Sequence, residues 1–430
     1  MTAIWSREAK YQRWQEVEIA IVEAWARAGL VPGEDLEEIR AKARFDIARC
    51  DEIEEVTRHD LMAFVRNLSE NVGGVDALDE KQDEAHAGRW IHYGVTSYDV
   101  IDTALGMMMR DSVDVLRESL NGLQVALREL MQRHGDIPCI GRTHGIHAEP
   151  ITFGHKVHGW AMEMARSDER LAACRDEIAV GKISGAVGIH AHVEPDMERE
   201  ICERLGLRPD PNSTQIIARD RHAHVLSVLA VLAGSLERIA TELRNLQRTE
   251  ILEVQEAFAA GQTGSSAMPH KRNPWNSETV CGLARVVRGN AHAMLESVMT
   301  WHERDLTNSS LERVIFPDTF QLVDFMIHRM TRILKGLQVM ESNMMRNLRQ
   351  MGDLVFSEHV MVALVAKGMT REAAYKVAQR NAAKAWDGED FRTAVAGDPD
   401  VTSRLSEGEV ERLFDLEHHL RNAPPGNSLG

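Results

Sequence analysis

In VLSVLAVLAGSLERIATELRNL (residues 225–246), apolar residues recur at alternating spacings of four and three. That spacing places their side chains along one side of an α-helix. The residues of this seam are Val225, Leu229, Leu232, Leu236, Ile239, Leu243 and Leu246. A seam of this length predicts a long helix that packs against other helices.

Two more seams follow the same spacing. The first is Leu116, Leu120, Leu123, Leu127 and Leu130, and the second is Val323, Ile327, Met330, Leu334 and Leu337. All 12 prolines lie outside three long runs, residues 33–137, 212–268 and 318–398, as suits long helices. No alternating, strand-like segment is comparably strong. We therefore predict an all-α protein with a long central helix bundle.

The domain boundaries follow from the breaks in this helical pattern. Thr96 offers a hydroxyl cap with Asp99 three residues later, which predicts a helix start. We expect an N-terminal helical domain (1–96), a central bundle (97–342) and a C-terminal helical domain (343–430).

Composition excludes several function classes. The 430 residues carry a formal net charge of −16, from 66 acidic and 50 basic side chains, which disfavours a general binder of nucleic acid or anionic membrane. The five cysteines are odd in number and contain no CxxC pair, so free thiols in a reducing cytoplasm are expected and a thiolate zinc site is not.

The sequence also bears on location. The start, MTAIWSREAK, does not read as a signal peptide, and the apolar run at 225–233 is too short to span a bilayer. We expect a soluble, cytoplasmic protein.

Polar stretches interrupt the helical background at a few places. The strongest is GQTGSSAMPHKRNPWNSE (261–278), with glycines, two prolines and a cationic cluster. The others are TRHD (57–60), WIHYGVTSYD (90–99), GRTHGIHAEP (141–150), GKISGAVG (181–188), STQIIARDRH (213–222) and WHERDLTNSSLERVIFPD (301–318). Gathered in one cleft, these residues would bind a multiply anionic ligand and transfer protons.

Each motif also has a simpler interpretation. His144 and His147 could be metal ligands, but the glycine between them and the missing carboxylate partner weaken the case for a metal site. An imidazole in a turn is well placed as an acid or base. Thr96 and Ser97 could serve simply to cap a helix. The N–H groups and hydroxyls of the same helix start can also hold an anion. The glycines at 181–188 lack the dinucleotide-binding spacing, and no GxSxG elbow marks a hydrolase serine.

The loop GSSAMPHKRNP resembles the signature loop of the fumarase/aspartase superfamily, whose members eliminate fumarate from succinyl-type substrates. HKRNP is similar to the version in adenylosuccinate lyases of bacterial type, whereas fumarases and aspartases tend to have GKVNP and argininosuccinate lyases QKKNP. The seven polar motifs occur in the family's order over nearly the whole chain. The resemblance implies a carbon–nitrogen lyase that releases fumarate from adenylosuccinate, giving AMP, and from SAICAR, giving AICAR, in purine biosynthesis.

The resemblance also implies roles for individual residues. Ser265 would be the general base, and His144 the general acid. His59 would support the acid, Glu278 would orient or polarise the histidine, and Lys271 would meet the negative charge that develops on the carboxylate. The matches to positions that hold the succinyl and carboxylate portions are Thr96, Ser97, Thr143, Gln215, Lys271 and Asn273. The matches to positions near the nucleotide and its phosphate are Arg58, Asp60, His92, Arg304, Ser309 and Arg313.

At the level of assembly, the family implies a homotetramer whose active sites are each shared between three subunits, with no organic cofactor or metal. Two departures stand out: Met1 aligns just after a family segment with a phosphate-gripping Arg-Tyr pair, and the acidic stretch at 73–88 is longer than usual and expected as a surface loop.

Three alternatives for the function stay open. They are another fumarate-releasing lyase of the superfamily, a non-catalytic helical scaffold and, disfavoured by charge, a nucleic-acid-binding helical protein.

Overall fold

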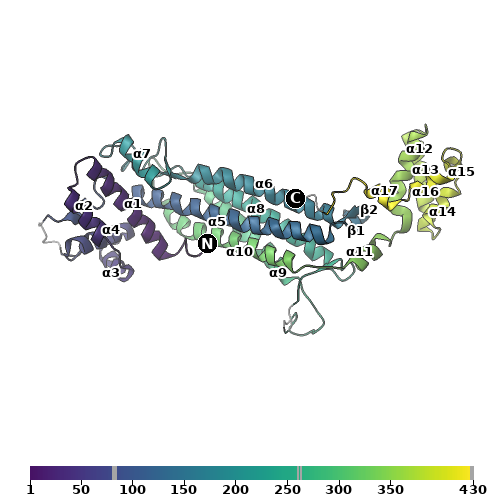
Figure 1. Ribbon diagram of the computed structural model, residues 1–430, viewed down its shortest axis with the longest axis horizontal. Coiled ribbons are helices and arrows are strands. Elements are labelled where there is room, and N and C mark those ends of the chain that lie inside the picture. Colours follow the sequence, from purple (N-terminus) through teal and green to yellow (C-terminus); the bar gives the residue numbers. More distant parts are fainter. Residues whose placement is uncertain (80–84, 259–260, 262–263, 427–430) are drawn as a thin grey trace. The chain divides into compact units, whose positions relative to one another are not determined.

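The computed structural model describes residues 1–79, 85–258, 261 and 264–426. Most of these residues are helical, which confirms the predicted fold class (Figure 1). They form two compact units, one made of Met1–Asn121, Arg166–Ser235 and Gly282–Ile327, the other of Gly122–Ala165, Leu236–Cys281 and His328–Gly430. We call them unit 1 and unit 2. The division into three domains stays a prediction. Residues 80–84 of the expected acidic loop and residues 262–263 of the signature loop lie outside the described residues.

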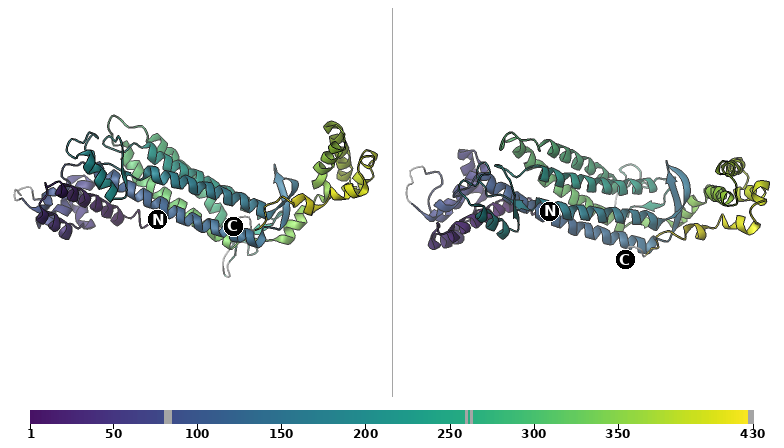
Figure 2. Two further views of the ribbon diagram at one scale, coloured as in Figure 1. Left: turned by 45° about the horizontal axis from the view of Figure 1, so that its top comes forward. Right: turned by 90° about the horizontal axis from the view of Figure 1, so that it is seen from above.

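Five long helices dominate the described chain. They are α5 (Ser97–His134), α6 (Phe153–Ile178), α8 (Asp220–Leu246), α9 (Trp275–Glu296) and α10 (Thr307–Lys335). Each contributes a segment to both units, and within each unit these segments run side by side (Figure 2). Every residue of the three predicted seams is buried, so the predicted bundle is confirmed. Helix α8 is long and apolar enough to cross a membrane by length and composition, but 61% of that window is buried, as in a core helix.

Unit 1 adds a group of shorter helices around an aromatic core. These are α1 (Arg7–Arg27), α2 (Gly33–Lys42), α3 (Ile47–Thr57), α4 (Asp60–Gly73), η1 (Ala87–Trp90) and α7 (Pro195–Arg204), with the short strands β3 (Val180–Gly181) and β4 (Arg208–Pro209). Tyr11 stacks on Trp14, and both rings contact Phe64. Their burial holds α1 against α4, which positions the start of α4 for the site described below.

Unit 2 contains a β-hairpin and a second apolar core. The hairpin is β1 (Pro138–Thr143) paired antiparallel with β2 (Ile146–Thr152), and β5 (Val254–Gln255) pairs with β6 (Gln338–Val339). The C-terminal elements are α11 (Glu341–Leu348), η2 (Gly352–Phe356), α12 (Ser357–Ala366), α13 (Arg371–Trp386), α14 (Phe391–Ala396), α15 (Pro399–Thr402), α16 (Glu407–Arg412) and α17 (Leu416–Leu420). They enclose Phe356, Phe391 and Phe414.

The hairpin was not predicted from the apolar pattern. Its two-residue turn is His144-Gly145, with φ of 56° and 79°, between the paired residues Thr143 and Ile146. Two successive positive φ angles are typical of the turn that matches the twist of a hairpin. The only sequence signal for the hairpin was therefore the pair His144-Gly145, which is suited to positive φ. That signal is weak here because the flanking strands do not alternate apolar and polar residues.

Candidate active site

The TRHD motif forms the junction between α3 and α4. Arg58 ends α3 in the left-handed conformation, with φ of 53°. His59 then caps α4, its Nδ1 accepting a hydrogen bond from the Met62 N–H at 3.4 Å. This geometry turns the chain sharply. It leaves the Arg58 guanidinium and the His59 ring exposed, while Asp60 is half-buried.

Asp60 joins this junction to the start of α10. Its Oδ2 lies 2.8 Å from Nη2 of Arg313, and its Oδ1 accepts from the Leu61 N–H at 2.8 Å. Burial opposes ionisation, but Arg313 and the Leu61 N–H hold the pKa of Asp60 below its ordinary value. Nε of Arg313 is 3.5 Å from Oγ of Ser309. The structure thus brings together three residues predicted from motifs far apart in the sequence.

A cavity of about 330 Å³ in unit 1 is lined by these three residues and by two cations that the sequence reasoning missed, Arg7 and Lys10. The Lys10 ammonium lies 4.6 Å from the centre of the Trp14 ring. Burial and the neighbouring arginines lower the pKa of Lys10, against the opposing pull of Asp60. On a sequence, both cations resemble ordinary solvated charges on an amphipathic helix, so only their placement reveals a cationic pocket.

Arg304 supplies buried donors in the same unit. Its guanidinium carbon lies 3.4 Å from the centre of the Tyr98 ring, and its Nη1 donates to Oε1 of Gln215 at 2.9 Å. Its Nε and Nη2 are buried and have no hydrogen-bond partner within the described part of the chain. Burying such donors unpaired is costly, so this guanidinium is suited to receive an anion.

His92 is held by a buried carboxylate. Its φ is 64°, its backbone N–H donates to Oε2 of Glu18 at 2.9 Å, and its Nδ1 lies 2.7 Å from Oε1 of the same residue. Burial opposes the charged ring, but Glu18 raises the pKa of His92 above its ordinary value. Because Glu18 only accepts hydrogen bonds, Nδ1 carries a proton and the ring orientation is set.

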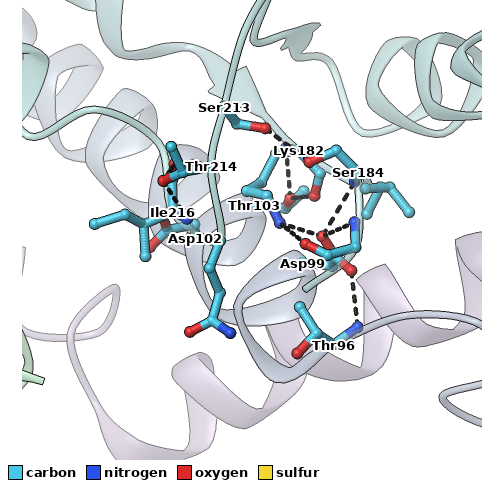
Figure 3. Close-up of polar contacts among 12 residues, drawn as sticks. Thr96, Asp99, Asp102, Thr103, Lys182, Ser184, Ser213, Thr214 and Ile216 are labelled. Carbon is cyan, nitrogen blue, oxygen red and sulfur yellow. Dashed lines mark hydrogen bonds and ion pairs between the residues drawn. The ribbon is translucent and has the colours of Figure 1, made fainter. Parts of the chain in front are cut away.

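The start of α5 is fixed by Asp99 (Figure 3). Oδ2 of Asp99 accepts from the Thr96 N–H at 2.8 Å, which confirms the predicted helix start at Thr96 and Ser97. Its Oδ1 accepts from the N–H groups of Ser184 and Gly185, both at 3.2 Å, and pairs with Nζ of Lys182. Asp99 and Lys182 are completely buried. The sequence analysis did not predict this network. It ties GKISGAVG to the start of α5, next to the predicted binding residues Thr96 and Ser97.

In unit 2, the hairpin presents Thr143 and His144 at its exposed tip. One residue earlier, Arg142 pairs with the buried Glu253 through two contacts of 2.6 and 3.2 Å. Two bonds between a planar guanidinium and a carboxylate fix direction as well as distance. The turn conformation and this brace therefore hold the His144 backbone in place.

The described part of the signature loop is organised by its own polar contacts. Oγ of Ser265 accepts from the N–H groups of Ala267 at 3.4 Å and Met268 at 3.2 Å. Nδ2 of Asn273 donates to the Gly264 carbonyl at 3.1 Å. A Cβ on Gly264 would lie 2.1 Å from the Lys271 carbonyl oxygen, so only glycine fits there.

A cavity of about 920 Å³ in unit 2 is lined by Lys271, Asn273 and Glu278. Glu278 lies in the first turn of α9, whose start is held by the buried Glu256 through the Ser277 N–H at 2.8 Å. Among the described residues, no hydrogen bond joins His144 to Ser265 or Glu278. The predicted site residues therefore form two sets. Unit 1 holds cations and buried donors suited to a multiply anionic ligand, together with His59. Unit 2 holds His144, Ser265 and Glu278, the other groups suited to proton transfer.

The chain is similar to known lyases over nearly its whole length. Residues 1–289 match the family described as Lyase, and residues 353–425 match the family described as Adenylosuccinate lyase C-terminus. The chain is 50% identical to the adenylosuccinate lyase of Synechocystis sp., covering 98% of this chain and 96% of the relative. It is 45% identical to that of Bacillus subtilis, covering 98% and 95%. Among solved structures, a fumarate lyase from Mesorhizobium sp. BNC1 superimposes with a TM-score of 0.87 at 28% identity, covering 100% of this chain and 96% of that one.

Proposed function

This chain belongs to the adenylosuccinate lyases, within the fumarase/aspartase superfamily, and we propose from that premise how its residues carry the reaction. The enzyme is a carbon–nitrogen lyase that eliminates fumarate from adenylosuccinate and leaves AMP. Use of SAICAR as a second substrate is part of the proposal.

Elimination begins with loss of a proton from the carbon next to a carboxylate, and Ser265 takes that proton. A serine hydroxyl is a poor base in water, so its oxyanion must be stabilised in place. The observation that carries this assignment is the pair of backbone N–H groups, of Ala267 and Met268, that point at Oγ of Ser265. They would stabilise the alkoxide that is left when the hydroxyl has lost its own proton to solvent. The alkoxide then takes the proton from the substrate carbon and becomes a neutral hydroxyl. Lys271 and Asn273, on the same loop, meet the charge that develops on the substrate carboxylate.

The second half of the reaction protonates the departing nitrogen, and His144 is the general acid. This assignment is supported by the position of His144 at the exposed tip of the hairpin, from which its imidazole can reach a ligand. His59 assists this acid, and Glu278 orients the imidazole. These roles follow the family pattern.

The phosphate and ribose bind in unit 1. Arg304 contributes its unpaired buried donors, Arg313 and Ser309 line the 330 Å³ cavity, and Lys10 adds a further cation. A dianionic phosphate would replace the repulsion among these cations with charge-assisted hydrogen bonds. Arg58, Asp60, His92, Thr96, Ser97, Thr143 and Gln215 complete the proposed binding residues.

We also propose the homotetramer. The end of α9, the segment that joins it to α10 and the start of α10 expose large apolar side chains, at Leu295, Met299, Trp301, Leu306 and Val314. Exposed apolar groups clustered in this way are typical of an interface. Sites shared between three copies would let the two residue sets meet. A fully active monomer, measured by light scattering and assay at the same protein concentration, would contradict this arrangement.

The test is to mix purified protein with adenylosuccinate, follow the ultraviolet spectrum, and confirm AMP and fumarate by chromatography. Ser265→Ala should abolish turnover and leave substrate binding and the oligomer intact, and the matched control Ser266→Ala should stay active. Substantial turnover by Ser265→Ala would remove this serine from the role of base. Conversion of argininosuccinate or a muconate in preference to adenylosuccinate would favour another branch of the superfamily.

A further inference from the structure

A chain of two imidazoles ties strand β2 to the C-terminal helices within unit 2. Nε2 of His419, in α17, lies 2.9 Å from the Pro150 carbonyl oxygen of β2. Nδ1 of His419 lies 2.9 Å from Nε2 of His359, in α12. Nδ1 of His359 in turn lies 2.8 Å from the Leu413 carbonyl oxygen. Both rings are half-buried and lie with their centres 4.9 Å apart.

The hydrogen bonds in this chain determine how many protons it holds. Carbonyl oxygens only accept, so Nε2 of His419 and Nδ1 of His359 must each carry a proton. A neutral imidazole has one N–H group. If both rings were neutral, the two facing nitrogens would present lone pairs to each other at 2.9 Å. A hydrogen bond between them requires one more proton, which gives the pair of rings a single positive charge.

A pair of carboxyl groups lies beside the imidazole pair. Glu149 precedes Pro150 in β2, and Glu358 precedes His359 in α12. Burial, followed by a hydrogen bond to the Glu358 carboxyl, raises the pKa of Glu149, while His419 and His359 oppose that rise. Positive charge on the imidazole pair and negative charge on the neighbouring carboxyl groups therefore favour each other.

Other titratable groups lie on the neighbouring elements. His147 of β2 is half-buried, and burial followed by Arg142 lowers its pKa. Asp353 of η2 pairs with Arg392 at 2.8 Å. Glu417 and His418 of α17 are exposed. The proton shared by the two imidazoles thus belongs to groups at the contact between β2 and the C-terminal helices.

We propose that His359 and His419 are positioning residues that hold the β1–β2 hairpin through a proton shared between their rings, so that the placement of His144 depends on pH. Loss of the shared proton at higher pH leaves two lone pairs in contact, and the anchor at Pro150 opens. Uptake of a further proton at lower pH places two N–H groups against each other and has the same effect. The catalytic consequence rests on the proposed role of His144, whereas the shared proton does not.

Histidine side-chain NMR on the full-length enzyme, with ¹³C-labelled imidazole and assignment by His359→Gln and His419→Gln, tests the proton directly. We expect the two rings to titrate as a coupled pair with an intermediate holding one added proton. We also expect each substitution to change the titration of the other ring. Two independent titrations, unaltered by replacement of the partner, would overturn the proposal.

Hydrogen exchange of the amides at 138–152 and the pH profile of kcat test the consequence. Glutamine at 359 can donate an amide N–H to Nδ1 of His419, the partner of His359 Nε2, without an added proton. His359→Gln should therefore keep the hairpin protected and remove the loss of protection at high pH. His359→Phe should speed exchange about tenfold or more at each pH at which the parent holds the shared proton, since a charge-assisted bond is lost. The exposed control His418→Gln should match the parent.

Two outcomes separate the two parts of the inference. Exchange in His359→Phe equal to that of the parent protein would refute the anchoring role. Altered exchange with an unchanged pH profile of kcat would leave the anchor standing and refute its link to catalysis, without bearing on the role of His144 as acid.

Discussion

The buried pair of Asp99 and Lys182 allows the sharpest test of how the site is held. Replacing Asp99 by asparagine keeps the shape but removes the charge, and one oxygen becomes an NH₂ group facing backbone donors. Lys182 is then left, among the described residues, with the Gly185 carbonyl at 3.3 Å as its remaining partner. Leaving one member of a buried ion pair without its partner costs about 3–5 kcal/mol of unfolding free energy. We expect a loss of that size for Asp99→Asn.

Replacing the other partner should cost less. In Lys182→Met, the Asp99 carboxylate keeps the backbone N–H groups of Thr96, Ser184 and Gly185. Several backbone N–H groups suffice to stabilise an ionised carboxylate, so the expected loss is about 1–3 kcal/mol. The double variant removes both charges and should be more stable than the sum of the two single losses predicts.

Urea unfolding, followed by circular dichroism at one protomer concentration, measures these differences, because the stability of an oligomer depends on concentration. The expected order of stability is parent, Lys182→Met, Asp99→Asn. A smaller loss for Asp99→Asn than for Lys182→Met, or strict additivity in the double variant, would refute the reasoning that the carboxylate is the better satisfied partner.

Three further predictions concern the loop, the phosphate pocket and pH. Gly264→Ala places a Cβ 2.1 Å from the Lys271 carbonyl oxygen, and should lower kcat about 100-fold without changing the melting temperature, as expected for a misplaced catalytic loop; near-normal kcat would contradict it. Arg313→Ala should raise KM by about 10- to 100-fold through loss of a charged hydrogen bond, and a pure kcat effect in steady-state assays would argue against a phosphate contact. Burial, followed by Arg219, lowers the pKa of His222 to about 3, so the unfolded chain takes up a proton below about pH 6.5 that the folded chain refuses. Unfolding free energy should fall by about 2 kcal/mol between pH 6.5 and 5 from this group, and His222→Gln should remove that part of the slope in urea titrations.

Much of the fold follows from local spacing. The residues at three- and four-residue intervals in 225–246 are all buried, and the helix beginning at Thr96 starts where its cap predicts. The hairpin was missed because strand pairing joins residues that give no local apolar period. The turn at His144 was recognised, but the two strands on either side of it were not. The predicted site residues remain proposals in their roles, but several lie together, such as Asp60 with Arg313 and Gln215 with Arg304.

The sequence by itself determined the helical bundle, its seams, the cap at Thr96 and the family, because each depends on residues close along the chain or on ordered motifs. The tertiary structure alone decided which charges meet. Lys10 became part of a cationic cavity, Lys182 the buried partner of Asp99, and His359 the neighbour of His419. The physical reason is that burial and pairing set the electrostatic state of a side chain, and both depend on segments distant in sequence that only the folded chain brings into contact.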